Sequence, residues 1–195
     1  MARRKRPEGT AARQAHLLES AIVVVGRGGL RGLTHRAVDR EADLPEGTCS
    51  VYFRTRLALL TALTTFVAQR LTDDVRAMGE ALPHPSGDPG PAIEATVDMV
   101  VRWSGQPELL ITMTELYLES VRTPSLRPVS GAWREQLVDV VEVLVQRAGK
   151  QDPRRRAKSI VGSVEGVAIS SLPMPPAERE AYLRDTLDSV ITGLT

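Results

Sequence analysis

The strongest constraint on the fold is a long apolar stripe that runs from about Thr55 to Leu82. Its residues recur at steps of three and four, which is the spacing of one face of an α-helix. The pattern predicts one long helix, and the proline-rich segment 83–91 that follows predicts a loop. The stripe consists of Leu60, Leu63, Val67, Leu71, Val75, Met78 and Leu82.

The same helical spacing recurs along most of the chain, in segments separated by proline and glycine. Thr34 and Asp152 stand where helix N-caps belong, and Pro45 suits the first position of a helix. No internal repeat and no convincing strand pattern is found, so the sequence predicts an all-α protein of about nine helices. The other expected helices are Thr10–Gly26, His35–Ala42, Pro45–Val51, Pro91–Ser104, Pro107–Val121, Val129–Ala148, Arg154–Ser171 and a last one from the Pro173–Pro176 break to about Ile191.

One stretch, Ile22–Val25, is β-branched and fits a buried strand by propensity alone. Ala15 and Leu18 continue the helical spacing into this stretch, so we expect a helix. Gly26 and the two glycines close behind it predict the end of that helix. These glycines do not fit a phosphate-binding loop, because they follow a helix and lack the Gly-Lys-Ser/Thr ending.

Composition limits where such a chain works. No apolar run approaches the ~20 residues that a membrane span needs. The basic N-terminus is not followed by the apolar segment of a signal peptide. The single cysteine cannot form an internal disulfide. We therefore expect a cytoplasmic protein without a membrane partner.

Charge is distributed unevenly along the chain. Residues 1–56 carry eleven Lys/Arg against six Asp/Glu, whereas residues 57–195 carry fourteen against eighteen. A basic first quarter on a mildly acidic remainder indicates a head that binds a polyanion. The alternative is an accidental basic tail, because Arg3–Arg6 supply four of these charges.

The segment 43–54, DLPEGTCSVYFR, contains the only cysteine, Cys49. Nucleophilic cysteine chemistry usually needs a nearby base, and the three histidines, His16, His35 and His84, match no such spacing. One cysteine and three scattered histidines also lack the paired spacing of a metal site. We therefore expect no catalytic residue, no metal and no cofactor.

The same segment fits a helix-turn-helix. A short helix capped by Thr34 is followed by a turn and by a second short helix, which would enter a DNA major groove. Small residues let such a helix approach DNA, and short hydroxyl side chains reach phosphates or base edges. The candidate DNA contacts are Thr34, Arg36, Glu46, Gly47, Thr48, Ser50, Tyr52, Arg54 and Arg56.

The run from Arg13 to Leu63 resembles the N-terminal DNA-binding domain of TetR/AcrR-type transcriptional regulators. The shared parts, in order, are a helix, a glycine-containing loop, a Thr-capped helix, a turn, a Gly-Thr recognition helix ending in an aromatic pair, and a long helix. The resemblance implies a ligand-responsive repressor that binds a palindromic double-stranded DNA operator as a homodimer. It further implies a basic flexible arm (1–9), a helix-turn-helix domain (10–56) and an effector-binding and dimerisation domain (57–195).

Four positions match family positions that contact DNA. The resemblance gives Thr34 the phosphate-contacting cap, Thr48 the DNA-contacting threonine and Tyr52 the backbone-contacting aromatic. Arg56 takes the place of a basic residue after the aromatic pair, where lysine is usual.

Three positions in the recognition helix depart from the family pattern. Ser50 stands where a tyrosine is frequent, and its reach is shorter. Glu46 replaces a basic or polar residue, so it either accepts from a cytosine amino group or favours the helix N-terminus. Cys49 falls on a core position and fits a buried small hydrophobe. The alternative is a thiol-based redox-sensing regulator.

The resemblance also implies roles for the C-terminal region. We expect dimerisation by a four-helix bundle that two copies build from their last two helices. The expected interface consists of Ile160, Val164, Val167, Ser171, Leu183, Leu187, Val190 and Ile191. The pocket of an unknown small-molecule effector is expected among the helices before them, with core packing as the alternative role of its residues. The pocket candidates are Met99, Arg102, Trp103, Met113, Tyr117 and Trp133.

Two other classes of function compete with a regulator. One is an enzyme that uses Cys49, which the missing base disfavours. The other is a helical interaction module that never binds DNA. Salt-dependent binding to DNA fragments separates the regulator from both.

Overall fold

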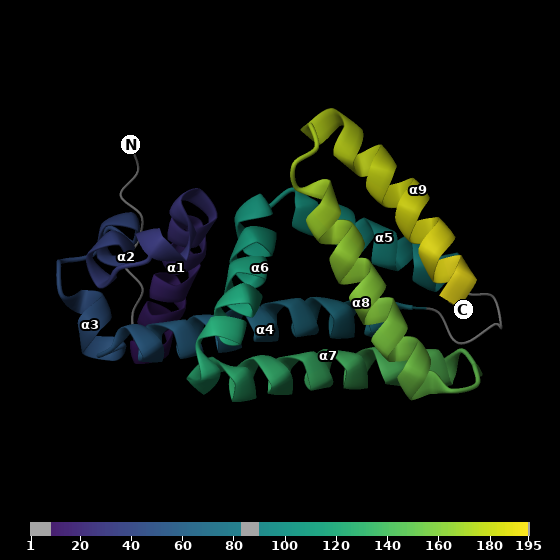
Figure 1. Ribbon diagram of the computed structural model, residues 1–195, viewed down its shortest axis with the longest axis horizontal. Helices are drawn as coiled ribbons and strands as arrows, with labels where there is room; N and C mark the ends of the chain where they lie inside the picture. Colours follow the sequence, from purple (N-terminus) through teal and green to yellow (C-terminus); the bar gives the residue numbers. More distant parts are fainter. Residues whose placement is uncertain (1–8, 83–89, 195) are drawn as a thin grey trace.

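The computed structural model describes residues 9–82 and 90–194. These residues form nine α-helices and one short 3-10 helix, and they contain no strand, which confirms the all-α prediction (Figure 1). The elements are α1 (Thr10–Gly32), α2 (His35–Glu41), α3 (Thr48–Tyr52), α4 (Arg56–Ala81), α5 (Gly90–Ser104), α6 (Pro107–Arg122), η1 (Pro124–Leu126), α7 (Arg127–Arg147), α8 (Pro153–Ser171) and α9 (Pro176–Leu194).

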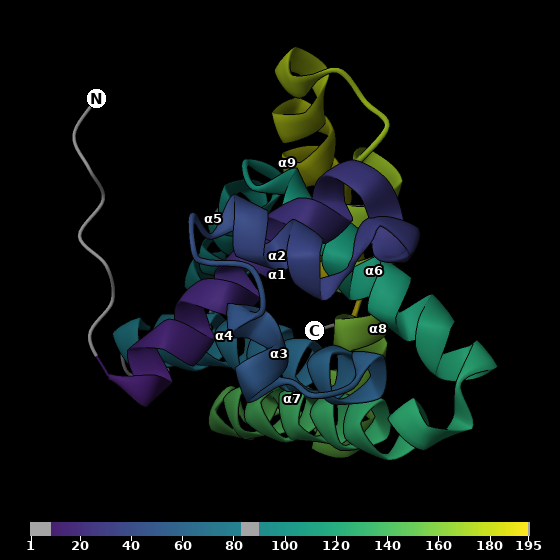
Figure 2. The same ribbon diagram turned by 90° about the vertical axis from the view of Figure 1, so that its left-hand side faces the viewer.

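The helices are arranged as a small head and a larger body along one axis (Figures 1 and 2). Helices α1–α3 form the head, and α2 and α3 lie at its free end. Helix α4 runs from the head into the body, where it packs along α7. In the body α8 packs on α7 and α9, and α5 packs on α9. Helix α6 packs against α1 and so joins the body to the head.

The long helix follows the predicted stripe. Leu60, Leu63 and Val67 are buried, and Leu71 and Val75 continue the buried face further along α4. Residues 1–8 of the predicted flexible arm (1–9) lie outside the described part of the chain, as do residues 83–89 of the predicted loop.

The first helix runs past Gly26 without interruption, but it does break at Gly29, one of the two following glycines that the sequence predicts as its end. Helix α1 continues to Gly32, with a break at Gly29, where φ is 62° and ψ is −177°. Glycine at position 26 serves packing instead. A Cβ there would lie 2.4 Å from Glu108 Cβ and 2.6 Å from Glu108 Cα, so only glycine allows α6 to approach so closely.

Two predictions about helix starts also need correction. Helix α3 begins at Thr48 rather than at Pro45, because Gly47, at φ 93°, occupies the N-cap in a left-handed conformation. Asp152 is at the N-cap of α8, but its backbone is left-handed and its side chain makes no capping hydrogen bond. The cap predicted at Thr34 is confirmed, since its side chain accepts from Ala37 N at 3.1 Å.

The hydrophobic core does not break at the head. One cluster of buried side chains extends from Leu17 and Val38 in the head to Leu116 and Leu187 in the body. A second, smaller cluster lies where α4, α5, α7 and α8 meet, around Met99. Head and body therefore share one continuous core.

Candidate nucleic-acid interface and effector site

The second helix of the helix-turn-helix is positioned by a buried carboxylate. Asp39 on α2 is 0% exposed and accepts two backbone hydrogen bonds from the start of α3. Its Oδ2 accepts from Gly47 N at 2.8 Å and its Oδ1 accepts from Cys49 N at 2.7 Å. Asp39 therefore caps α3 from a neighbouring helix, which replaces the local cap that α3 lacks.

Sequence analysis did not single out Asp39. The available signal was its position beside Val38, which faces the core, because an acidic residue on a buried helix face needs partners. Two histidines complete the frame of the head. His16 Nε2 donates to Ala42 O at 2.8 Å, and His35 Nε2 donates to Phe53 O at 2.5 Å.

The predicted DNA contacts on α2 and α3 lie at the free end of the head. Thr34, Arg36, Glu46, Gly47, Ser50 and Arg54 are exposed, and Thr48 and Tyr52 are partly buried. The Thr48 hydroxyl donates to Pro45 O at 2.6 Å, and the Ser50 hydroxyl donates to Gly47 O at 2.7 Å. Because each hydroxyl donates its proton to a carbonyl, its lone pairs remain as acceptors.

Glu46 lies next to a cation rather than alone. Its carboxylate is 4.0 Å from Arg36 Nε, and both side chains are largely exposed. An exposed pair at this distance contributes little to stability. Its effect is to offset part of the negative charge of Glu46.

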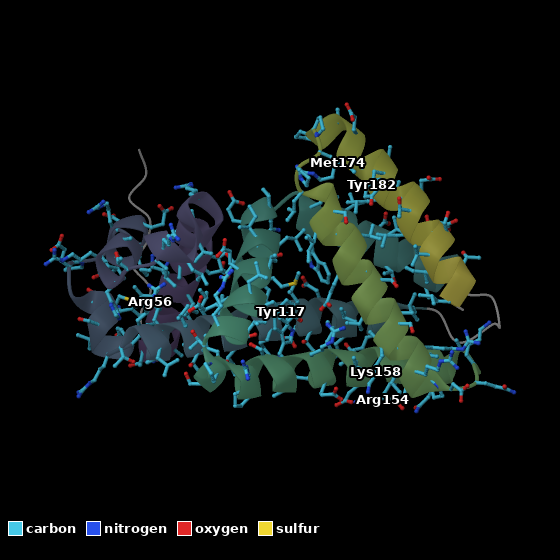
Figure 3. The ribbon with its side chains drawn as sticks, viewed as in Figure 1. Arg56, Tyr117, Arg154, Lys158, Met174 and Tyr182 are labelled. Atoms are coloured by element: carbon cyan, nitrogen blue, oxygen red, sulfur yellow. The ribbon has the colours of Figure 1, made fainter. Side chains whose placement is uncertain are left out.

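Arg56 has a structural task that the sequence did not predict. Its Nη1 donates to Leu33 O at 2.5 Å and its Nη2 donates to Leu30 O at 2.6 Å (Figure 3). The guanidinium thus satisfies carbonyls at the C-terminal end of α1 and neutralises the negative end of that helix. These bonds engage two of its nitrogens, while the residue as a whole stays exposed.

Cys49 is 0% exposed and lies in the core of the head. Burial, with a smaller contribution from the charge of Asp39, raises the pKa of the thiol from 9.0 to about 12. Nε2 of His16 and of His35 is committed to a backbone carbonyl. The thiol is therefore kept protonated and has neither of these rings as its base, which disfavours both thiol catalysis and redox sensing.

The body contains one compact group of aromatic and charged side chains. The rings of Tyr117 on α6 and Trp133 on α7 are stacked, with centroids 4.7 Å apart and planes 6° apart. The Tyr117 hydroxyl donates to Glu165 Oε1 at 3.0 Å, and Arg134 donates to Glu165 Oε2 at 2.7 Å. Trp133 Nε1 is buried and has no hydrogen-bond partner among the described residues.

The burial and the charges within this group favour the protonated forms of Tyr117 and Arg134. Burial, followed by the neighbouring Glu165 carboxylate, raises the pKa of Tyr117. The hydrogen bond to Glu165 raises the pKa of Arg134. Tyr117 therefore acts as a donor and Arg134 as a cation at neutral pH. Sequence analysis named Tyr117 and Trp133 but missed Glu165, because its partners lie on two helices that are distant in sequence.

Of the other four pocket candidates, Met113 is buried in the same core cluster as Trp133, against which Tyr117 also packs. Met99 is buried in the second core cluster, and Met113 is buried in the first. Trp103 donates to Asp74 Oδ2 at 2.7 Å, which holds α5 to α4. Arg102 is exposed.

The expected dimer interface is only partly available to a second copy. Ile160, Val167 and Val190 are partly buried, whereas the other five expected residues are buried within the single chain. The stripe of α9 faces α5, which the sequence could not show, and it is therefore core rather than interface. The buried five are Val164, Ser171, Leu183, Leu187 and Ile191.

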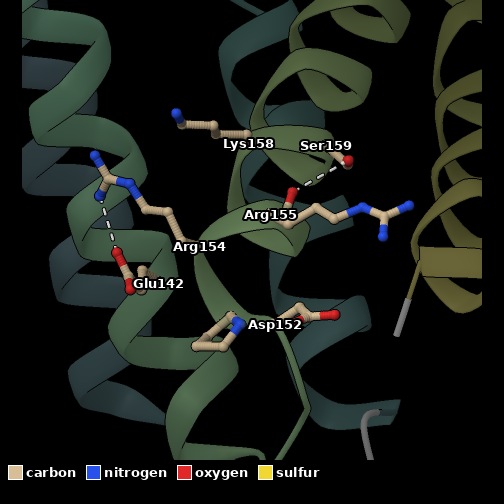
Figure 4. Close-up of a pocket in the computed structure, with 7 residues that line it drawn as sticks. Glu142, Asp152, Arg154, Arg155, Lys158 and Ser159 are labelled. Carbon is tan, nitrogen blue, oxygen red and sulfur yellow. Dashed lines mark hydrogen bonds and ion pairs between the residues drawn. The ribbon is translucent and has the colours of Figure 1, made fainter.

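A surface pocket of about 650 Å³ lies at the junction of α7 and α8 (Figure 4). Glu142 lines it on α7, and Arg154 on α8 forms ion pairs with Glu135, Asp139 and Glu142. None of the predicted pocket residues lines it. The ion pairs hold the start of α8 against α7, so this pocket is formed where the two helices join.

Two searches of the described residues bear on other functions. No helix among them is long and apolar enough to cross a membrane. No group of three or more His, Cys, Asp or Glu side chains within residues 9–82 and 90–194 is arranged to hold a metal ion.

Known proteins resemble this chain in fold and in sequence. A family model described as tetracyclin repressor-like, C-terminal domain, matches residues 87–193. The multidrug binding protein EbrR complexed with imidazole is 31% identical, with 92% of this chain and 94% of that chain covered and a TM-score of 0.63. EbrR complexed with ethidium is 29% identical, with 92% and 98% covered and a TM-score of 0.60.

A TetR-family protein from Streptomyces coelicolor A3 is 30% identical, with 92% of this chain and 98% of that chain covered and a TM-score of 0.68. A comparison with curated proteins gave no match. The helix-turn-helix head on an all-helical body therefore defines a transcriptional regulator. The chain belongs to the TetR family.

Proposed function

We propose that this regulator binds an operator in double-stranded DNA as a homodimer and releases it when a small molecule binds in the body. The observation that carries the DNA-binding part is the position of α3, which Asp39 holds by two hydrogen bonds at the free end of the head. A short helix presented in this way fits a major groove. The basic balance of residues 1–56 supplies the attraction to phosphate.

In this proposal Thr34, Thr48 and Tyr52 contact the DNA backbone, and the exposed Arg36 and Arg54 pair with phosphates. Selection of bound sequences from a random DNA pool tests it. We expect a single palindromic site and an affinity that falls steeply with salt. Failure to enrich any sequence, with no binding at low salt, would favour the helical interaction module.

The dimer is proposed to form through the outward surfaces of α8 and α9. Gly166 is exposed on α8, and a Cβ built there meets nothing within 4 Å. Ile160, Val167 and Val190 border this surface and are partly buried. Two such faces bury each other in a four-helix arrangement. A dimer places two copies of α3 on one face of a palindrome.

Analytical ultracentrifugation tests the interface with a matched pair of variants. Gly166→Arg is expected to give a monomer, because a long charged side chain would enter the interface. Gly131→Arg on α7 is the control, since a Cβ at this exposed glycine also meets nothing within 4 Å. A Gly166→Arg protein that remains dimeric would exclude this surface.

The effector is proposed to be a planar aromatic cation that binds at Tyr117, Trp133 and Glu165. The two rings are stacked on each other and Trp133 is only 2% exposed, so the ligand would have to separate the rings to stack on them, and Glu165, whose side chain is 16% exposed, offers a carboxylate. Such a ligand would replace Arg134 as the partner of Glu165. Structures of the similar EbrR in complex with ethidium and with proflavin support this ligand class.

Release of DNA is proposed to pass through α6, which carries Tyr117. At its other end α6 packs on α1 through Glu108 and Gly26, and the buried Thr112 hydroxyl donates to Ile22 O at 3.2 Å. A shift of α6 therefore moves α1 and changes the spacing of the two heads. The ligand acts by favouring the shifted arrangement.

Fluorescence titration with ethidium and with proflavin tests the effector site. Glu165→Gln is expected to weaken binding at least tenfold, and Arg134→Gln to strengthen it, because the arginine competes with the ligand for the carboxylate. Glu178→Gln, at an exposed position of α9, is the control. Equal affinities in all four proteins would exclude Glu165 as the site, and tight binding that leaves operator affinity unchanged would exclude the coupling.

A further inference from the structure

Val51 on α3 has the most exposed large hydrophobic side chain among the described residues, at 73%. It follows the buried Cys49 by two residues, which places it about 200° around the helix axis from the core side. The helix therefore buries its cysteine and exposes an isopropyl group, and α3 lies at the free end of the head (Figure 2).

The surroundings of Val51 leave this group unobstructed. Gly47, one turn earlier, has no side chain, and a Cβ built there would meet nothing within 4 Å. The hydroxyls of Thr48 and Ser50 bend back to carbonyls of their own turn, at 2.6 Å and 2.7 Å. The outermost group on this part of α3 is therefore apolar.

We propose that Val51 contacts the C5-methyl group of a thymine in each half of the operator and so sets base preference at that position. This inference rests on the proposed binding of DNA by α3. The thymine methyl is the apolar group among the base edges of the major groove, and aliphatic side chains recognise it by contact. An exposed valine gains by this contact, because both partners leave water.

The size of the effect follows from the group that is buried. Covering one methyl-sized group is worth about a fourfold change in affinity for each half-site. Two symmetric contacts therefore amount to about fifteenfold for a dimer on its palindrome.

The test uses the operator obtained from the random pool. Each thymine and its symmetry mate are replaced by deoxyuridine, which removes only the methyl group, and affinity is measured at fixed salt. We expect one symmetric pair to lose about fifteenfold and the other pairs to lose little. Replacing that thymine by 5-methylcytosine, with guanine opposite, keeps the methyl and separates the methyl contact from the base pair.

The matched variant is Val51→Ala. It is expected to bind thymine and deoxyuridine operators equally at the sensitive position and to unfold at the same temperature as the parent, because the side chain touches little of its own chain. Val143→Ala, at a 44% exposed position of α7, is expected to keep the full sensitivity.

Three outcomes would overturn the inference. An operator without thymine in α3's reach, equal affinity for every deoxyuridine substitution, or undiminished sensitivity in Val51→Ala each excludes the methyl contact while DNA binding stands. A parent protein that binds no DNA at all removes the proposed function, and the inference with it.

Discussion

Gly26 and Glu108 lie in direct contact where α1 meets α6, and the contact leaves no room for a side chain on the glycine. A Cβ at position 26 would lie 2.4 Å from Glu108 Cβ, 2.5 Å from its Cγ and 2.6 Å from its Cα. The last of these atoms is backbone, so the strain is relieved only by moving the helix. The head and the body are thus held at one fixed separation.

Gly26→Ala is therefore expected to destabilise the protein by about 1 to 3 kcal/mol, as overpacking does. It should also weaken operator binding, because α1 is displaced from α6. Urea denaturation and operator titration measure the two effects. Gly28→Ala is the control, since a Cβ there meets nothing within 4 Å. Equal stability of the two variants would show that α6 yields without cost.

The two hydrogen bonds of Asp39 predict a loss of stability in the head. Asp39→Ala removes both acceptors, and each unsatisfied N–H costs about 1 to 3 kcal/mol. Asp39→Asn keeps one acceptor oxygen and is expected to lose less. Operator affinity should fall in the same order, since α3 loses its support. Amide hydrogen exchange of Gly47 and Cys49 checks the cause, and unchanged protection in Asp39→Ala would contradict it.

Arg56 allows a test of a structural against a phosphate-binding role. Arg56→Ala is expected to lower stability by about 1 to 2 kcal/mol, because Leu30 O and Leu33 O lose a charged donor. The slope of log affinity against log salt should stay unchanged. If stability is unaffected and the slope falls by about one, Arg56 binds phosphate instead.

Arg54 provides the comparison for that experiment. Its side chain is exposed and makes no hydrogen bond or ion pair with the described residues. Arg54→Ala is expected to leave stability unchanged and to reduce the salt slope by about one. The two arginines should thus give opposite patterns in the same pair of measurements.

The buried thiol predicts slow chemistry in the folded protein. With the pKa of Cys49 raised from 9.0 to about 12, the thiolate fraction at pH 8 falls by about a thousandfold. Iodoacetamide should therefore label Cys49 only after unfolding in urea. Peroxide should leave operator affinity unchanged in the parent and in Cys49→Ser alike. Rapid labelling of the native protein, or a peroxide response lost in Cys49→Ser, would support the alternative that Cys49 is a redox sensor.

The same shift has a consequence for stability at alkaline pH. Above pH 9 the unfolded chain loses the thiol proton, whereas the folded protein keeps it until the pKa of Cys49 at about 12. The unfolded state then binds fewer protons, so the free energy of unfolding falls as pH rises through this window. Cys49→Ala lacks this contribution. Urea denaturation at pH 7.5 and pH 10 should show a larger decline for the parent than for the variant.

Local patterns predicted the helices well, and their ends less well. The stripe of α4 and the cap at Thr34 depend on residues within a few positions of each other, and both are present. The same local rules predict boundaries at Gly26 and Pro45, whereas the structure has the break at Gly29 and the start of α3 at Thr48. Packing of α6 overrides the low helix propensity of Gly26, and the left-handed Gly47 with its Asp39 bonds delays the start of α3.

The residues of the candidate sites were also predicted only in part from the sequence. The sequence placed the DNA-facing residues on one short helix, and it picked out Tyr117 and Trp133 because aromatic residues are scarce. It did not supply Glu165, whose hydroxyl and guanidinium partners are 48 and 31 positions away in sequence. The sequence also did not show that a residue on α2 provides the cap of α3.

By itself, then, the sequence determined an all-α chain with a basic helix-turn-helix head, since amphipathic spacing and capping act over a few residues. Only the tertiary structure decided that the stripe of α9 is covered by α5 within one protomer, that Arg56 closes the end of α1, and that α6 rests on α1 at Gly26. An apolar face must be buried, but periodicity does not name what buries it. What covers the face is decided by contacts between helices that are distant in sequence, such as the contact between Thr112 and Ile22, which are 90 positions apart.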